Sequence, residues 1–235
     1  MGWSREALAY HSGVSWSAIA QIESGRRKDV RLSSLSALAT ALGVSVDYLI
    51  GTGASTQPLF EHRVLTYASD DELVAGAIPF LAEGIDASHC LLAVTTEAKT
   101  EVLREALQDR VEHVEFTDWA DWYRSPQEAM NRYGAFLKEK THAGATWIRV
   151  VAEAAWEGDT QAEIAAWTRY ESLVNLAFAS SPATIICTYD ERSFPVGVVA
   201  DARRTHPEIA HGDAASASPT YQAPEDFLVS PQTSG

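Results

Sequence analysis

Between residues 60 and 211, short apolar runs of strand character alternate with longer segments of helical periodicity. These runs predict strands at residues 64–67, 90–94, 111–116, 147–152 and 183–189. Strands that alternate with helices build βαβ units, and runs that are apolar on both faces, such as Thr184-Ile185-Ile186-Cys187, are typical of covered parallel strands. The pattern therefore predicts a three-layer α/β domain with a mostly parallel sheet.

Several of the intervening helices have clear start signals. Ser69, Ser125 and Thr160 each stand three residues before a glutamate, so each can cap a first turn while the glutamate binds back to the cap. We place the α/β domain at residues 60–211, after a small, polar linker at 53–59 that contains proline. From residue 212 to 235 the chain shows little periodicity, so we expect a poorly ordered tail in which Tyr221 and residues 227–229 dock locally.

Residues 1–52 follow a different pattern, which predicts a small all-α helix-turn-helix domain. Ser4 can cap a helix over residues 5–12, Gly13 can supply the turn, and Ser15 can cap a second helix that ends at Glu23. Three apolar positions of the second helix share one face, which we expect to pack inward: Ala18, Ile19 and Ile22.

The opposite, N-terminal face of that second helix is expected to enter the major groove of DNA. Gln21 can read adenine, Ser17 can bond to most base edges, and Trp16 can cover a thymine methyl group. The basic residues that follow would contact phosphates without reading sequence. The predicted DNA-binding residues are Ser15, Trp16, Ser17, Gln21, Arg26, Arg27, Lys28 and Arg31.

The net charge of −14 opposes nucleic-acid binding only if the charge is spread evenly over the chain. Residues 1–53 hold five lysines and arginines against four acids, so their charge is 5 − 4 = +1 and the remainder carries −15. Four of those five cations lie within residues 26–31. This focused positive charge suits contact with a phosphate backbone.

Several classes of protein are disfavoured by absent motifs. No apolar run approaches the roughly 20 residues of a membrane span, so we expect a cytoplasmic protein without a membrane partner. Glycine-rich phosphate loops, the nucleophile elbow and the zinc-protease motif are missing, so we expect no enzyme and no catalytic residue. Cys90 and Cys187 lie in apolar runs and are expected to be buried thiols, while His89, His206 and His211 have no compact ligand spacing. We therefore expect neither a metal nor a cofactor.

Polar residues in apolar surroundings mark a candidate ligand site. Glu171 and Asn175 lie within the apolar stripe of the predicted helix over residues 160–180, and burying them is costly unless they find partners, for which Arg149 is our candidate. Glu153 and Asp190 end strands, where open α/β sheets bind ligands. A satisfied internal hydrogen-bond network explains the same pattern. The candidate ligand-binding residues are Arg149, Glu153, Trp156, Glu171, Asn175, Tyr189 and Asp190.

The N-terminal segment resembles the phage-repressor (Cro/XRE-like) helix-turn-helix family. The resemblance rests on Leu8-Ala9, Gly13-Val14-Ser15, Ile19, Ile22-Glu23-Ser24-Gly25-Arg26 and residues 41–49. It implies base contacts by Trp16, Ser17 and Gln21 and backbone contacts by residues 26–28. Members of that family have one more helix before the turn, so we expect either that the true start lies upstream or that the module is truncated.

The second domain resembles the MEDS domain, a sensory domain of methanogen and methylotroph regulators. The resemblance rests on Tyr67–Leu73, Arg149–Glu153, Tyr170-Glu171, Asn175, Cys187–Asp190 and Arg203–Pro207. It implies a sheet distantly like that of RecA-type ATPases without their phosphate loop, and a sensing role in repressors or beside anti-sigma-type kinases. It implies no particular ligand.

Three functions are compatible with these observations. The leading hypothesis is a sequence-specific transcriptional regulator, a homodimer on double-stranded operator DNA, whose α/β domain senses a small-molecule effector. The alternative is a protein-interaction switch of the anti-sigma or partner-switching type, in which the acidic domain binds a regulatory protein and DNA binding is weak or lost. An enzyme would use Glu153, Glu171 and Asp190 as acid and base groups, but a nucleophile and a substrate cradle are missing.

Overall fold

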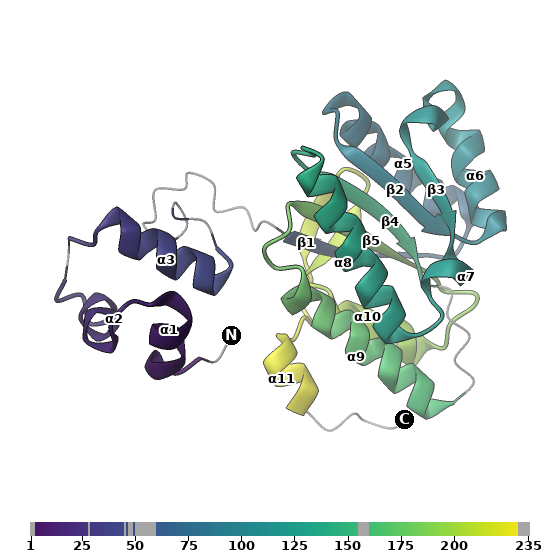
Figure 1. Ribbon diagram of the computed structural model, residues 1–235. Helices are drawn as coiled ribbons and strands as arrows, with labels where there is room; N and C mark the ends of the chain where they lie inside the picture. The colour runs from purple at the N-terminus through teal and green to yellow at the C-terminus, as the bar shows by residue number, and fades with distance from the viewer. Residues whose placement is uncertain are drawn as a thin grey trace. The chain divides into compact units, whose positions relative to one another are not determined.

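The computed structural model describes residues 3–27, 29–44, 46, 49, 60–154 and 160–229 (Figure 1). The chain divides into two units, Met1–Gln57 and Pro58–Gly235.

The first unit contains helices α1 (Arg5–Ser12), α2 (Trp16–Glu23) and α3 (Leu32–Leu42). The predicted caps are confirmed, because the hydroxyls of Ser4 and Ser15 accept hydrogen bonds from the backbone N–H groups of Ala7 and Ala18. Gly13 ends α1 at a φ of +68°, a left-handed conformation that glycine adopts without strain. Ile19, Leu38 and Ala39 are buried, so the inward face of α2 packs in the small core of this unit.

The second unit is built on a seven-stranded sheet with the order β3-β2-β4-β5-β1-β6-β7. The strand pairs are parallel except for β6 and β7, which confirms the predicted mostly parallel sheet. Every residue of β4 and β5 is buried. The strands are β1 (Phe60–Tyr67), β2 (Cys90–Thr95), β3 (Glu115–Asp118), β4 (Ile148–Glu153), β5 (Ala183–Asp190), β6 (Glu208–His211) and β7 (Ala214–Ala217).

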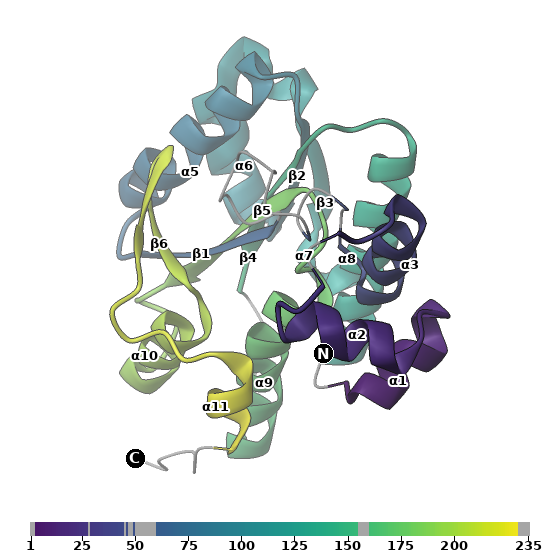
Figure 2. The same cartoon turned by 90° about the vertical axis from the view of Figure 1, so that its left-hand side faces the viewer.

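Helices cover both faces of this sheet, as predicted (Figure 2). One face packs against α5 (Asp70–Asp86) and α6 (Glu97–Leu107), and the other against α8 (Pro126–His142), α9 (Gln161–Ala177) and α10 (Val196–Thr205). A short helix, α7 (Trp119–Trp122), follows β3. Successive residues of a strand face opposite sides, so Val150 belongs to the α8–α9 core and Val151 to the α5–α6 core.

The predicted helix starts are confirmed. The hydroxyls of Ser69, Ser125 and Thr160 each accept a hydrogen bond from the backbone N–H of the glutamate three residues later. At Thr160 the capping box is complete, because Glu163 also accepts from the Thr160 backbone N–H at 3.1 Å.

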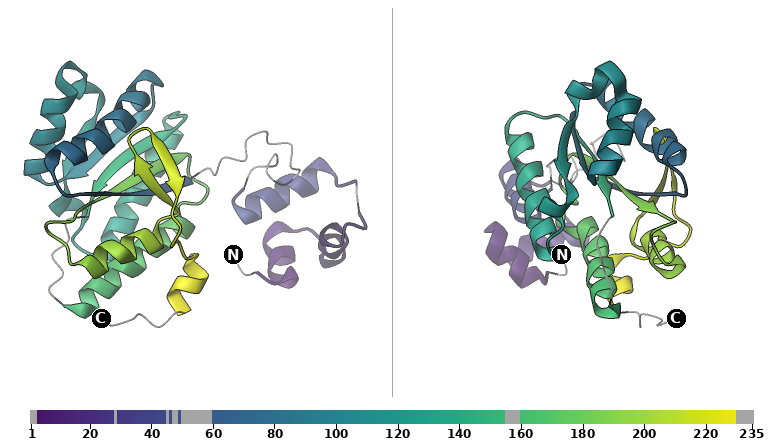
Figure 3. Two further views of the ribbon diagram at one scale, coloured as in Figure 1. Left: turned by 180° about the vertical axis from the view of Figure 1, so that it is seen from behind. Right: turned by 90° about the vertical axis from the view of Figure 1, so that its right-hand side faces the viewer.

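Two sequence predictions are corrected. The first half of the predicted strand at 111–116 belongs to a 3₁₀ helix, η1 (Gln108–His113), and β3 begins only at Glu115. Its apolar residues Val111 and Val114 are three apart, a spacing that suits a 3₁₀ turn. The segment from residue 212 onward is structured as far as it is described, because β7 pairs with β6 and is followed by α11 (Pro224–Val229; Figure 3, left). Phe227 of α11 is 2% exposed, so the predicted local docking is confirmed there.

Candidate functional site

The N-terminal face of α2 is open to solvent. Ser15, Ser17 and Gln21 are exposed, and the Trp16 side chain is 47% exposed. The indole nitrogen of Trp16 donates to Glu6 Oε1 at 2.9 Å, so α1 holds the ring in place on this face. The structure therefore presents together the residues predicted to read bases.

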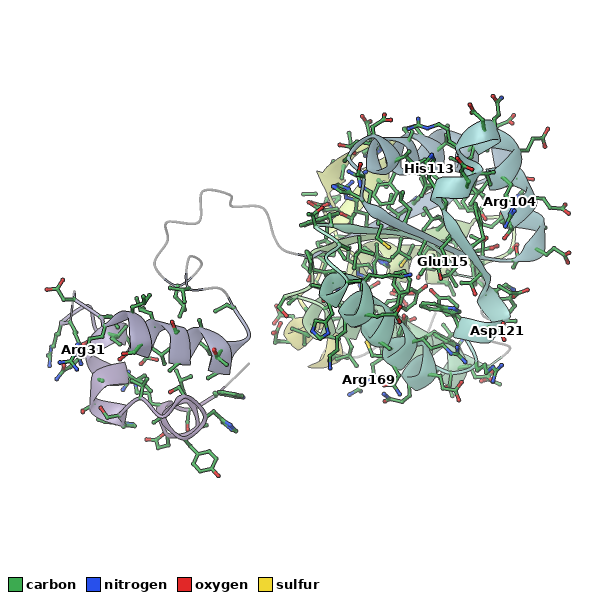
Figure 4. All side chains as sticks on the ribbon, turned by 45° about the horizontal axis from the view of Figure 1, so that its top comes forward. Arg31, Arg104, His113, Glu115, Asp121 and Arg169 are labelled. Carbon is green, nitrogen blue, oxygen red and sulfur yellow. The ribbon has the colours of Figure 1, made fainter. Side chains whose placement is uncertain are left out.

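The predicted phosphate contacts surround the loop that follows α2. Arg26, Arg27 and Arg31 are exposed, and within the described part of the chain none of them forms an ion pair (Figure 4 labels Arg31). Arg5 pairs instead with Glu23 and links α1 to α2. Lys28 lies outside the described residues. Arg27 Nε donates to the Asp29 backbone carbonyl oxygen at 3.3 Å, and the guanidinium groups of this loop are otherwise exposed.

The proposed pairing of Arg149 with Glu171 is wrong. Arg149 points to the α5 side of the sheet, where its guanidinium contacts Glu83 Oε2 at 2.7 Å and the Phe80 carbonyl oxygen at 2.8 Å. Its Nε also donates to His89 Nδ1 at 3.1 Å. Because Ile148 and Val150 face α8 and α9, the residue between them must face the other way.

Glu153 and Asp190 lie at the carboxyl edge of the sheet, as predicted. Glu153 Oε2 accepts from the Thr96 backbone N–H at 2.6 Å and from the Thr96 hydroxyl at 2.9 Å, and burial raises the pKa of Glu153. Asp190 accepts from Arg192, which lowers the Asp190 pKa, and lies 3.5 Å from Lys99 Nζ. These carboxylates are engaged by the protein's own donors. Trp156 lies outside the described residues.

Glu171 is buried on the face of the sheet that α8 and α9 cover. It meets three other side chains there, and we call these four residues the histidine cluster. Its members are His62 on β1, Glu171 on α9, Cys187 on β5 and His206 just after α10. Their exposed fractions are 1%, 3%, 5% and 0%. One potential ligand atom from each residue lies within 4.8 Å of all the others.

The distances inside the histidine cluster are short. His62 Nε2 lies 3.3 Å from Cys187 Sγ and 3.5 Å from Glu171 Oε2. His206 Nε2 lies 3.6 Å from the same Glu171 oxygen, and Cys187 Sγ lies 3.8 Å from it. The ring of the predicted site residue Tyr189 lies edge-on to the His206 ring, with centroids 6.1 Å apart.

Hydrogen bonds outside the cluster define how both imidazoles are protonated. His206 Nδ1 lies 2.7 Å from the Ala202 carbonyl oxygen, which can only accept, so this nitrogen carries a proton. The Asn175 amide nitrogen donates to the Thr205 carbonyl at 2.8 Å, which leaves its oxygen to accept from His62 Nδ1 at 3.2 Å. Burial lowers the pKa of both histidines to about 3, so both rings are neutral. Each Nε2 therefore directs a lone pair into the cluster.

The comparisons with known proteins give one match in each of the two units of the structure. Residues 61–207, more than half of the chain, match MEDS, the methanogen/methylotroph, DcmR sensory domain. The chain belongs to the MEDS family. Residues 1–49 match the helix-turn-helix family, and no curated protein matches the chain. The protein therefore joins a helix-turn-helix unit to a MEDS sensory domain, and no described helix is long and apolar enough to cross a membrane.

The candidate ligand residues in the MEDS domain do not form one site. Arg149 packs against α5, and Glu153 and Asp190 lie at the carboxyl edge of the sheet. Glu171 and Asn175 lie on α9 and contact His62 on the opposite face of the sheet from Arg149, where Tyr189 packs beside His206. The sequence interpretation also missed the histidine cluster, because it grouped His206 with His89 and His211. Those two histidines bind Arg149 and Ser216 instead. His62 could have indicated the cluster from the sequence, because it alternates with Phe60 and Val64 and so shares their buried face of the strand.

A groove on the surface of the MEDS domain runs between α8 and α9, with a volume of about 590 Å³. Its walls are mainly apolar, and Arg169, labelled in Figure 4, stands among them. Leu176, one of the lining residues, is 49% exposed. The lining residues are Pro126, Gln127, Met130, Ala166, Arg169, Tyr170, Leu173, Leu176 and Ala177.

Proposed function

We propose that this protein is a transcriptional regulator that binds operator DNA through α2 and responds to a signal received by its MEDS domain. The observation that carries the proposal is the exposed face of Ser17 and Gln21 on a capped helix, beside arginines without ion-pair partners in the described chain. A free polar face is what base recognition requires, and nearby unpaired guanidinium groups suit phosphates. The proposal assigns no catalytic reaction to the chain.

Operator recognition of this kind works best with two copies of the chain. Helix-turn-helix dimers bind half-sites about 34 Å apart, one turn of DNA, so a change in the spacing of the two units changes affinity. In our proposal the MEDS domain sets that spacing in a homodimer.

The signal in this proposal is a small, largely apolar effector. The groove between α8 and α9 has a volume of about 590 Å³. That size is within the range of roughly 300 to 1,000 Å³ typical of ligand pockets. Its apolar walls favour a ligand with little charge, and Arg169 offers one group for orientation.

Fluorescence anisotropy with DNA from upstream of the protein's own gene tests the DNA-binding part. Gln21→Ala should lose about 1–3 kcal/mol of discrimination at one base position while non-specific binding stays unchanged. Arg27→Ala should weaken binding to all sequences and reduce the dependence of log affinity on log salt by about one unit. Gln161→Ala, at an exposed position of the MEDS domain, is the matched control and should bind like the unmodified protein.

Absence of any sequence-preferring, salt-sensitive complex would contradict the proposal. If the same preparation then retains a stoichiometric regulatory protein and no DNA in a pull-down, the partner-switching function replaces it.

A further inference from the structure

The histidine cluster has the dimensions of a tetrahedral metal site. Zn²⁺ binds imidazole nitrogen and carboxylate oxygen at about 2.0–2.2 Å and thiolate sulfur at about 2.3 Å, so the edges of a tetrahedral site measure about 3.3–3.7 Å. The four measured edges of the cluster are 3.3, 3.5, 3.6 and 3.8 Å. The remaining two pairs lie within 4.8 Å, so the longest edge can exceed a tetrahedral edge by about 1 Å and the side chains would close around an ion by that amount.

One nitrogen of the cluster is left without a hydrogen-bond partner. His206 Nε2 is fully buried and has no hydrogen-bond partner, although it faces Glu171 Oε2 at 3.6 Å. Because Nδ1 of this neutral ring holds the proton, Nε2 and an ionised carboxylate would face each other as two acceptors. A proton on Glu171 would donate over 3.6 Å, well beyond the roughly 2.5–3.0 Å of an O–H hydrogen bond.

The surrounding groups also resemble those of a metal site. Ligand histidines usually donate their second ring nitrogen to a carbonyl or a carboxylate, which directs the free nitrogen toward the metal. Here the Ala202 carbonyl and the Asn175 amide oxygen have this role for His206 and His62. Asn175 is itself oriented by the Thr205 carbonyl, so the second shell is built from fixed groups.

We propose that His62, Glu171, Cys187 and His206 bind one divalent transition-metal ion, with Zn²⁺ as the best fit. Two neutral imidazoles, one thiolate and one carboxylate compensate the charge of the ion in full, which makes the buried site electrically neutral. Imidazole and thiolate ligands exclude Mg²⁺ and Ca²⁺, which require oxygen. Four protein ligands leave no open position, so the ion connects β1, β5, α9 and the end of α10. This proposal does not depend on DNA binding.

The first test uses the full chain. Elemental analysis of the purified, untagged protein should find about one Zn²⁺ per chain. After chelation, Co²⁺ should restore one equivalent and produce the visible bands of tetrahedral coordination together with a thiolate-to-cobalt band in the near ultraviolet. The thermal midpoint should fall on chelation and recover with Zn²⁺, because the ion binds only the folded chain.

Variants of the two cysteines identify the ligand. Cys187→Ser should lose the thiolate-to-cobalt band, whereas Cys90→Ser, the matched control, should keep it. Cys90 is half-buried and lies outside the cluster. If Cys187→Ser does not fold, His206→Gln and the chelation of the unmodified protein give independent readings. A folded chain that takes up no Co²⁺ under reducing conditions, or a thiolate band that follows Cys90, would overturn the proposal.

Discussion

Two glycines within helices of the MEDS domain differ in the space around them. Gly76 in α5 is buried, and a Cβ added there would lie 2.6 Å from both Cδ atoms of Leu65 on β1. Gly134 in α8 has room, because the nearest atom to such a Cβ, Phe178 Cε1, is 3.6 Å away. Alanine at the two positions therefore makes the same backbone change in a closed and in an open environment.

The magnitude can be worked out for each position. Replacing a helical glycine with alanine stabilises by about 0.5–1 kcal/mol, because the unfolded chain loses freedom. Nothing opposes this gain at Gly134. At Gly76 both methyl groups and Cγ of Leu65 stand within 3.2 Å of the added Cβ, and because Leu65 is buried its side chain must repack, which costs about 1–3 kcal/mol. Because the backbone gain is the same at both positions, Gly76→Ala should be about 1–3 kcal/mol less stable than Gly134→Ala.

Thermal and urea unfolding of the full chain, followed by circular dichroism, measures both variants. For a domain of this size 1 kcal/mol corresponds to about 2–4 °C, so the midpoint should rise slightly for Gly134→Ala and should lie about 2–12 °C lower for Gly76→Ala than for Gly134→Ala. If Gly76→Ala were as stable as Gly134→Ala, the close contact between α5 and β1 would be refuted.

Further predictions concern a helix cap and an ion pair. Thr160→Ala removes the hydroxyl that accepts from the Glu163 backbone N–H, and should lower the free energy of unfolding by about 0.5–2 kcal/mol in urea titrations. A loss below the error of the titration would mean that the capping box does not stabilise the domain. Arg192 lowers the folded-state pKa of Asp190, so the stabilisation is present above the unfolded pKa and is lost as the pH falls through the folded value. Asp190→Asn should therefore flatten the acidic side of the stability profile measured between about pH 6 and pH 2, and an unchanged slope would contradict the role of this pair.

Much of the fold could be predicted from the sequence because its signals are local. Helix ends are marked within one turn, by a serine or threonine before the helix, a glycine after it or a glutamate in its first turn. The bounds of α1 and α2 and the starts of α5, α8 and α9 were therefore predicted correctly. Runs that are apolar on both faces likewise indicate a parallel sheet between two helical layers. The focused charge at residues 26–31 and the exposed face of α2 belong to the same class of local signals.

The buried polar groups could not be assigned in this way, because their partners come from distant segments. His62 contacts Asn175 across 113 residues and Cys187 across 125 residues. In a strand covered on both sides, apolar periodicity also fails to show which face a polar residue takes, and this is why Arg149 was assigned to Glu171 although it binds Glu83. By itself the sequence determined most of the elements, their order and the layers they form, but not η1, β7 or α11. Only the tertiary structure decided that two histidines, a cysteine and a glutamate meet in the interior, because strand pairing and helix packing bring them together.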